Sequence, residues 1–441
     1  MKKLILMVAA VALVMPAVTA QKINVASVQA KLAKSDADIA NPKKSEKAAT
    51  WVNRAKLYAD AITLPTKNIY RKLNVAMLDA QMGVTPNEKK SETVYGYEWV
   101  DVHSKNNEVV GWEIVKEIHP GAYDVVCEAM KKAVALDPAQ VEKLKEVTTL
   151  LVNYYSELGS GCVDIEKYAV AVDSYIKAAR LQEITGKVDP KLYFYSGQLA
   201  AFLGAQDVKF FVEGQKYLQE AQKLGYQDES GNLYYFLFHC YYGQRVNDRE
   251  NIVKAKNTLL EGIAKYPRNE RILDGLMQLY TSEEGIGDPA DLVTLIDKAL
   301  AENPKNADLW FGRGRVFFKL QNYDECIASF QQIDELKPND YDTNFYLGYF
   351  YMAKGDEVNR AFNARLDSIN SQEAYQEGLK EVNTAYMKSL PWLEKAMELK
   401  PESVDCAEYL KVLCFRLRNE DGIMDKYNKY NAIYKKLKGI Q

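Results

Sequence analysis

Residues 307–340 decide the fold, and they read ADLWFGRGRVFFKLQNYDECIASFQQIDELKPND. Large and small residues alternate at helical spacing in two successive runs. The key positions are Trp310, Gly314 and Phe317 in the first run, Cys326, Phe330 and Ile333 in the second, and Pro338 at the end. The gap at Gly314 lets one helix approach its partner closely. The stretch therefore predicts a helical hairpin.

This 34-residue unit recurs along the chain, which is the pattern of a repeat architecture. Four consecutive units share one register, and their second helices end on Pro267, Pro304, Pro338 and Pro401. Weaker copies extend towards the N-terminus, where Trp51, Ala55 and Tyr58 fit a first helix. We expect seven or eight helix pairs, which form one solenoid over residues 21–441 and end in a terminal unit with a charged outer face.

The spacing resembles the tetratricopeptide repeat (TPR) family, in which each unit has a helix A followed by a helix B. The resemblance implies an all-α, right-handed superhelical solenoid of TPR hairpins whose A helices line a concave groove. It places these residues in the groove: Arg271, Asp274, Gln278, Phe311, Arg315, Phe318, Lys319, Phe345, Tyr349 and Met352. This mixed aromatic and polar surface suits a protein or peptide partner. Asp274, Gln278 and Phe311 depart from the Lys and Asn clamp with which some family members hold a C-terminal carboxylate.

The first twenty residues predict a secretory signal peptide, residues 1–20. Lys2 and Lys3 precede an apolar run, and the small residues Val18-Thr19-Ala20 precede Gln21. The run is shorter than a membrane span, and no later stretch is long and apolar enough to cross a bilayer. We therefore expect an exported protein in the periplasm or at the cell surface of a Gram-negative bacterium. Removing the two lysines changes the net charge from -3 to -5 (-3 minus 2), which argues against nucleic acid.

Two insertions interrupt the repeats. Residues 85–119 lie inside the first unit, and their β-branched and aromatic segments 93–102 and 109–118 predict a β-hairpin. This hairpin either caps the first repeat or binds a partner through its edge or its aromatic face, where Tyr97, Trp99 and Trp112 lie. The second insertion, residues 356–385, is polar and predicts a helical excursion in a late repeat.

No pattern in the sequence indicates catalysis, a cofactor or a metal site. His103, His119 and His239 are the three histidines, and they do not have metal-ligand spacing. Phosphate-binding, dinucleotide-binding and GxSxG motifs are absent. The six cysteines lack CxxC spacing, so we interpret them as buried thiols, with one disulfide as the alternative: Cys127, Cys162, Cys240, Cys326, Cys406 and Cys414.

These patterns favour a protein-interaction scaffold or adaptor of the cell envelope. The alternative is a glycan-binding or nutrient-uptake accessory protein, because tyrosines, of which there are 30, can stack on sugar rings. An enzyme of the helical-toroid type is a third hypothesis, since such folds can carry paired carboxylates. Here the paired carboxylates lie at unit ends and on polar faces.

Overall fold

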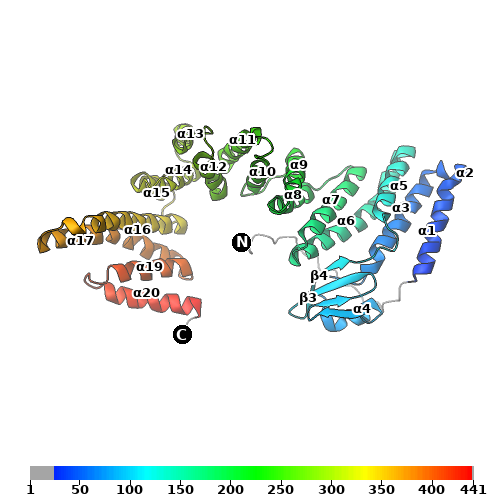
Figure 1. Cartoon of the computed structure of the whole chain (residues 1–441), viewed down its shortest axis with the longest axis horizontal. Helices are drawn as coiled ribbons and strands as arrows, with labels where there is room; N and C mark the ends of the chain where they lie inside the picture. Colours follow the sequence, from blue (N-terminus) through cyan, green and yellow to red (C-terminus); the bar gives the residue numbers. More distant parts are fainter. Residues whose placement is uncertain (1–23, 440–441) are drawn as a thin grey trace. The chain divides into compact units, whose positions relative to one another are not determined.

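The computed structural model describes residues 24–439, so the expected signal peptide lies outside the described residues. The chain divides into two compact units, Met1–Gln227 and Asp228–Gln441, and each is considered by itself below. Both are built from antiparallel helix pairs, and the first also holds a small sheet (Figure 1). The all-α solenoid fold predicted from the repeat is confirmed.

The helices and strands of the first unit are, in order, α1 (Val25–Ala40), α2 (Pro42–Ser45), α3 (Ala48–Thr63), η1 (Leu64–Thr66), η2 (Val75–Met77), α4 (Leu78–Met82), β1 (Glu88–Ser91), β2 (Val94–Gly96), β3 (Val100–Lys105), β4 (Glu108–Ile114), α5 (Ala122–Leu136), η3 (Pro138–Gln140), α6 (Val141–Asp164), α7 (Tyr168–Thr185), α8 (Pro190–Leu203) and α9 (Lys209–Lys223). Its hairpins are α3 with α5, α6 with α7, and α8 with α9. The sheet therefore lies in the connection between the two helices of the first hairpin.

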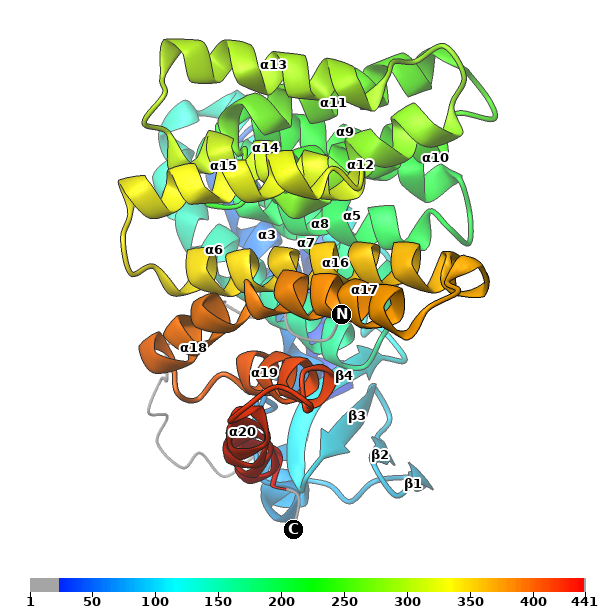
Figure 2. The same cartoon turned by 90° about the vertical axis from the view of Figure 1, so that its left-hand side faces the viewer.

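The helices of the second unit are α10 (Asn232–Gly243), α11 (Glu250–Lys265), α12 (Glu270–Ser282), α13 (Pro289–Glu302), α14 (Ala307–Lys319), α15 (Tyr323–Leu336), α16 (Tyr341–Ala364), η4 (Leu366–Ser368), α17 (Gln372–Met387), α18 (Leu390–Leu399), α19 (Val404–Arg416) and α20 (Ile423–Lys438). Helices α10 to α15 form three successive hairpins, and α19 pairs with α20. Helix α16 packs against both α17 and α18, as Figure 2 shows. Most of residues 356–385 therefore lengthens α16 and adds α17.

Local chemistry sets where these helices begin. Asn269, Asn306, Asn322 and Asp340 each accept a hydrogen bond from a backbone N–H in the first turn of the helix that follows. Such N-caps satisfy donors that have no partner inside the helix. Asp288 goes further and forms a capping box with its helix. Helices α12 to α16 therefore each have a start signal in the sequence.

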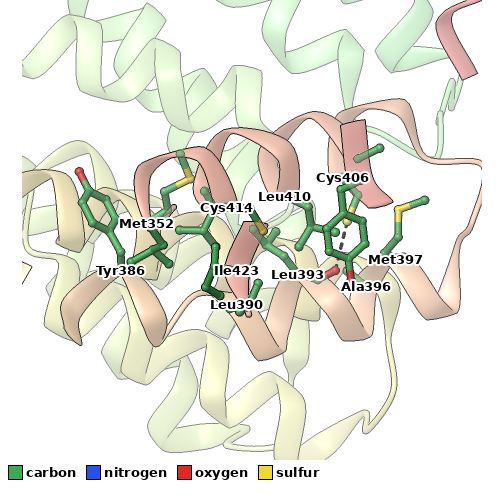
Figure 3. Packing of buried hydrophobic residues seen from close by; sticks show 14 of the residues in the cluster. Met352, Tyr386, Leu390, Leu393, Ala396, Met397, Cys406, Leu410, Cys414 and Ile423 are labelled. Atoms are coloured by element: carbon green, nitrogen blue, oxygen red, sulfur yellow. Dashed lines mark hydrogen bonds between the residues drawn. The ribbon is translucent and has the colours of Figure 1, made fainter. Parts of the chain in front are cut away.

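Buried side chains from successive helices form the core of each unit. Near the C-terminus, Leu393, Cys406, Leu410 and Cys414 have no exposed area and pack together between α18 and α19 (Figure 3). The Gly314 prediction is confirmed at the α14–α15 contact, because a Cβ there would lie 2.6 Å from Cδ2 of Phe330. All six cysteines are unpaired; five are buried, and Cys127 is half-buried.

The inserted sheet has four antiparallel strands in the order β1-β2-β3-β4, where the sequence analysis expected two. Strands β3 and β4 pair through a two-residue turn, with Asn106 and Asn107 at φ of 52° and 64°. The expected strand 93–102 is divided, because the chain turns after Gly96 and lets β2 pair with β3. The exposed residues of β1 have little strand propensity of their own, so its pairing with β2 was not apparent from the sequence.

Strand β4 packs closely on helix α6 at a pair of glycines. A Cβ on Gly111 would lie 2.5 Å from the carbonyl oxygen of Gly161, and one on Gly161 would lie 2.9 Å from Cα of Gly111. Beside this contact, the Cys162 thiol lies 3.7 Å from the carbonyl oxygen of Trp112. The sheet is thus docked backbone against backbone on the second hairpin.

Candidate functional site: the A-helix face of the second unit

Most of the expected groove residues lie on one connected surface of the second unit. Arg271, Asp274 and Gln278 follow one another at helical spacing on α12, and all three are exposed. Side-chain contacts link α12 to α14 and to α16, and aromatic contacts link α16 to α19. We call the surface the A-helix face and define it by Arg271, Asp274, Gln278, Arg315, Phe318, Lys319, Phe345, Tyr349 and Tyr409.

Charged side chains connect the A helices of three consecutive units. Nζ of Lys319 lies 2.8 Å from Oδ1 of Asp274, and the Arg315 guanidinium lies 3.2 Å from the carboxylate of Glu270. The Tyr346 hydroxyl donates a hydrogen bond of 3.0 Å to the same carboxylate. Burial, followed by the charge of Glu270, raises the pKa of Tyr346 to about 12, so its phenol remains a donor.

Aromatic rings form a continuous row across α14, α16 and α19. The ring centroids of Phe318 and Tyr349 are 5.5 Å apart, and those of Tyr349 and Tyr409 are 5.3 Å apart. Phe345 meets Tyr409 at 5.6 Å. All four rings are half-buried. The row therefore offers aromatic area to a partner while its members support one another.

Two of the expected groove residues, Phe311 and Met352, are buried, and Phe311 shows why. Its side chain is only 5% exposed. The ring packs against Phe330 and Tyr346 at centroid distances of 5.4 and 5.5 Å, and the Arg268 guanidinium covers it at 4.7 Å. The next A helix and an arginine from the preceding loop enclose the ring, so it belongs to the core. Met352 is likewise buried.

The sheet aromatics are also core residues, which corrects the expectation that they form an accessible face. Tyr97, Trp99 and Trp112 are 4%, 7% and 3% exposed. The Tyr97 hydroxyl donates to Asp79 at 2.9 Å, and Nζ of Lys116 lies 4.6 Å from the Trp99 ring centroid. A glycan could not stack on these rings without rearrangement.

The free edge of this sheet is equally unsuited to a partner. Every residue of β1 is exposed, and the strand reads EKKS and has a register shift between Lys89 and Ser91. Charges and bulges at an edge discourage the addition of another strand. Of the two interpretations of the insertion, the geometry favours a cap, but the sheet packs on α6 of the second hairpin and not on the first repeat as expected.

Three residues important to the A-helix face were missed in the sequence: Glu270, Tyr346 and Tyr409. Glu270 is the first residue of α12, where an acidic residue has a local role beside the helix dipole. Tyr346 and Tyr409 stand at the same place in their helices, five residues after the first residue of α16 and of α19. That shared position is the signal that could have identified both tyrosines.

His239 on α10 has an unusually low pKa. Burial, followed by the positive charge of Arg271, lowers the pKa of His239 to about 4. Its ring contacts Tyr235 at 4.4 Å, and the Arg271 guanidinium lies 5.5 Å from the Tyr235 ring. The imidazole is therefore neutral at ordinary pH.

The described part of the chain shows neither a cluster of metal-binding side chains nor a helix that could span a membrane. Within residues 24–439, no three His, Cys, Asp or Glu side chains cluster in a way that could hold a metal ion. Over the same residues, no helix combines the length and the apolar character needed to cross a bilayer.

Comparison with known proteins agrees with the repeat. The tetratricopeptide repeat family model matches residues 295–328, which run from α13 through α14 into α15. The chain contains a tetratricopeptide repeat. The hairpin whose residues decide the fold overlaps this match. No curated protein sequence matches the chain.

Solved structures also align with this chain. Residues 41 to the end of MamA from Desulfovibrio magneticus RS-1 are 18% identical, cover 49% of this chain and 97% of that chain, and give a TM-score of 0.27. A TPR repeats protein from Bacteroides fragilis NCTC 9343 is 18% identical. The alignment covers 59% of this chain and 97% of that chain, with a TM-score of 0.25. An IFIT1 monomeric mutant is 12% identical. The alignment covers 73% of this chain and 69% of that chain, with a TM-score of 0.34. At these scores the alignments carry no argument about function.

Proposed function

We propose that this TPR chain is a protein-interaction scaffold of a Gram-negative cell envelope, and that it binds a segment of a partner protein on the A-helix face of the second unit. The main support is the row of half-buried rings formed by Phe318, Tyr349 and Tyr409. Aromatic and arginine side chains contribute most of the binding energy at protein interfaces. Export is supported by the predicted signal peptide, in which Lys2 and Lys3 precede an apolar run.

The chemistry of the face suggests what the partner segment offers. The aromatic row suits apolar side chains, whereas Asp274, Lys319 and Arg315 already neutralise much of their charge within the face. A segment with a few apolar side chains and charges of both signs could pack its apolar groups on the aromatic row and place its charges beside the charged residues of the face. Because the ion pairs are partly exposed, they contribute selectivity more than affinity.

Photocrosslinking in cells tests this function. A photoreactive phenylalanine analogue replaces Tyr349 on the A-helix face, and the same analogue replaces Tyr375 on α17 as a matched control, because Tyr375 is 38% exposed. We expect one protein to be captured repeatedly from position 349 and not from position 375. Crosslinks that are identical at both positions, or only within the chain, would contradict the proposal.

Export is tested separately on the same cells. Mass spectrometry of the mature chain should find Gln21 at the N-terminus, and fractionation should find the protein outside the cytoplasm. An intact Met1 in a cytoplasmic fraction would remove the envelope from the proposal and leave the scaffold function standing.

A further inference from the structure

A cavity of about 170 Å³ lies in the first unit, under the segment that links β4 with α5. Residues of α3, α6 and α7 form its other walls. The cavity belongs to the first unit and the A-helix face to the second, so the role of the cavity is independent of the proposed function.

The inner wall of the cavity is apolar and aromatic. Aliphatic side chains line it, and they are Ile62, Pro65, Ile114, Ile118, Leu158 and Val170. Tyr154 and Tyr155 meet there edge to face, with centroids 5.0 Å apart. A wall of this kind suits the hydrocarbon part of a small molecule.

Charges of both signs stand at the same cavity. Nζ of Lys177 lies 5.7 Å from the Tyr155 ring centroid and 2.7 Å from Asp173. Glu117 accepts a 3.0 Å hydrogen bond from the backbone N–H of Gly121, and none of the ion pairs in the described part of the chain involves it. The cavity therefore combines an exposed carboxylate that forms no ion pair with an ammonium group that has further hydrogens to donate.

The electrostatic environment of Tyr155 shows that these carboxylates act on the cavity wall. Burial raises the pKa of Tyr155, and the nearby Tyr154, Glu117 and Asp173 raise it further. Both carboxylates are thus close enough to affect a group bound against this ring.

His119 supplies an unused polar atom at the same place. Its Nδ1 is buried and, within residues 24–439, has no hydrogen-bond partner. The imidazole ring packs edge to face against Tyr58, with the ring centroids 5.1 Å apart. Because Nδ1 has almost no accessible area, a ligand in the cavity would reach it only after a local rearrangement, and the site does not depend on it.

We propose that this cavity binds a free amino acid. Its side chain would lie against Tyr154 and Tyr155, its ammonium group would face Glu117, and its carboxylate would face Lys177. The ligand class follows from the cavity itself, which places a negative and a positive group beside an apolar wall of limited volume.

The test begins with the mature wild-type chain and the twenty free amino acids at millimolar concentration, with thermal stabilisation as the first readout. The best ligand is then titrated by calorimetry, together with its N-acetyl derivative and its amide. We expect saturable binding of the free amino acid, and binding about tenfold weaker or worse when either charged group is masked.

Two variants test the two charges of the protein. Glu117→Gln and Lys177→Met should each weaken binding about tenfold or more. Their matched controls are Glu92→Gln and Lys187→Met, which change exposed residues outside the cavity and should leave the affinity unchanged. Circular dichroism checks that all four variants are folded.

Three results would overturn the proposal: no amino acid binds saturably, the masked derivatives bind as tightly as the free ligand, or both cavity variants bind as the wild type does. The comparison of free and masked ligands uses only the wild-type chain, so it remains decisive if a variant fails to fold.

Discussion

At the scale of single residues, Gly314 shows how the packing of a repeat limits the size of a side chain. An alanine Cβ at this position would lie 2.6 Å from Cδ2 of Phe330, and Phe330 is fully buried and cannot move aside freely. We expect Gly314→Ala to lower the free energy of unfolding by about 1–3 kcal/mol, the usual cost of overpacking. Urea denaturation measures this.

The control for Gly314→Ala is Lys298→Ala on the exposed side of α13. It introduces the same residue where there is room, so it should change the free energy of unfolding by less than about 0.5 kcal/mol. Equal effects of the two substitutions would show that the α14–α15 contact is not closely packed.

His239 predicts a pH dependence of stability. Its folded-state pKa of about 4 is lower than its ordinary value of 6.5, so the unfolded chain binds more protons between these two pH values. The stabilisation is therefore complete above pH 6.5 and is lost as pH falls towards 4. The size is of order 1–3 kcal/mol for such a shift.

The measurement compares the wild type with His239→Gln by urea denaturation at pH 7, 5.5 and 4.5. The variant should lose less stability on acidification than the wild type does. His103→Gln is the control, because it removes a different imidazole, which lies 3.0 Å from Glu113 at the sheet. Parallel pH profiles of wild type and His239→Gln would contradict the assignment.

At the scale of elements, the contact between β4 and α6 depends on Gly111 and Gly161. We expect Gly161→Ala to separate the sheet from α6, because the new Cβ would lie 2.9 Å from Cα of Gly111, where a backbone cannot give way cheaply. The loss should be about 1–3 kcal/mol in the first unit.

Hydrogen exchange with mass spectrometry locates this effect. Amides of β3 and β4 should exchange faster in Gly161→Ala, while those of α14 and α15 should keep their protection. Exchange that rises uniformly along the chain would show that the substitution acts on global stability and not on sheet docking. Ser160→Ala is a neighbouring control, since it keeps the glycine contact and removes only the hydrogen bond between Ser160 and Tyr175.

At the scale of the whole molecule, a chain of stacked hairpins should respond to damage locally. Each hairpin contacts mainly its neighbours, so stability is close to a sum of local terms. Leu410 on α19 is fully buried, and Leu410→Ala should destabilise its region by about 2–5 kcal/mol. We expect faster exchange in α18 to α20 and unchanged exchange in α6 and α7.

Leu151→Ala on α6 is the matched variant, because Leu151 is also fully buried. It should give the reverse pattern, with faster exchange in α6 and α7 and unchanged protection in α18 to α20. If both variants accelerated exchange over the entire chain, the described hairpins would unfold as one cooperative body.

Much of the fold was determined by the sequence itself. The 34-residue spacing around Gly314 acts within one hairpin, so this local pattern was enough to predict helix pairs and their register. The same spacing located the exposed polar residues of α12. The four-stranded sheet was only partly predictable, because β1 has no strand pattern of its own and exists through its pairing with β2.

Only the tertiary structure decided which aromatic rings are accessible. Phe311 and Phe318 lie on the same helix and look equivalent in the sequence, yet Arg268 and Tyr346 enclose the first ring and leave the second half-exposed. Trp112 similarly became a core residue because its strand docks on α6. Periodicity specifies the side of a helix on which a residue lies, whereas burial depends on what distant segments place on that side.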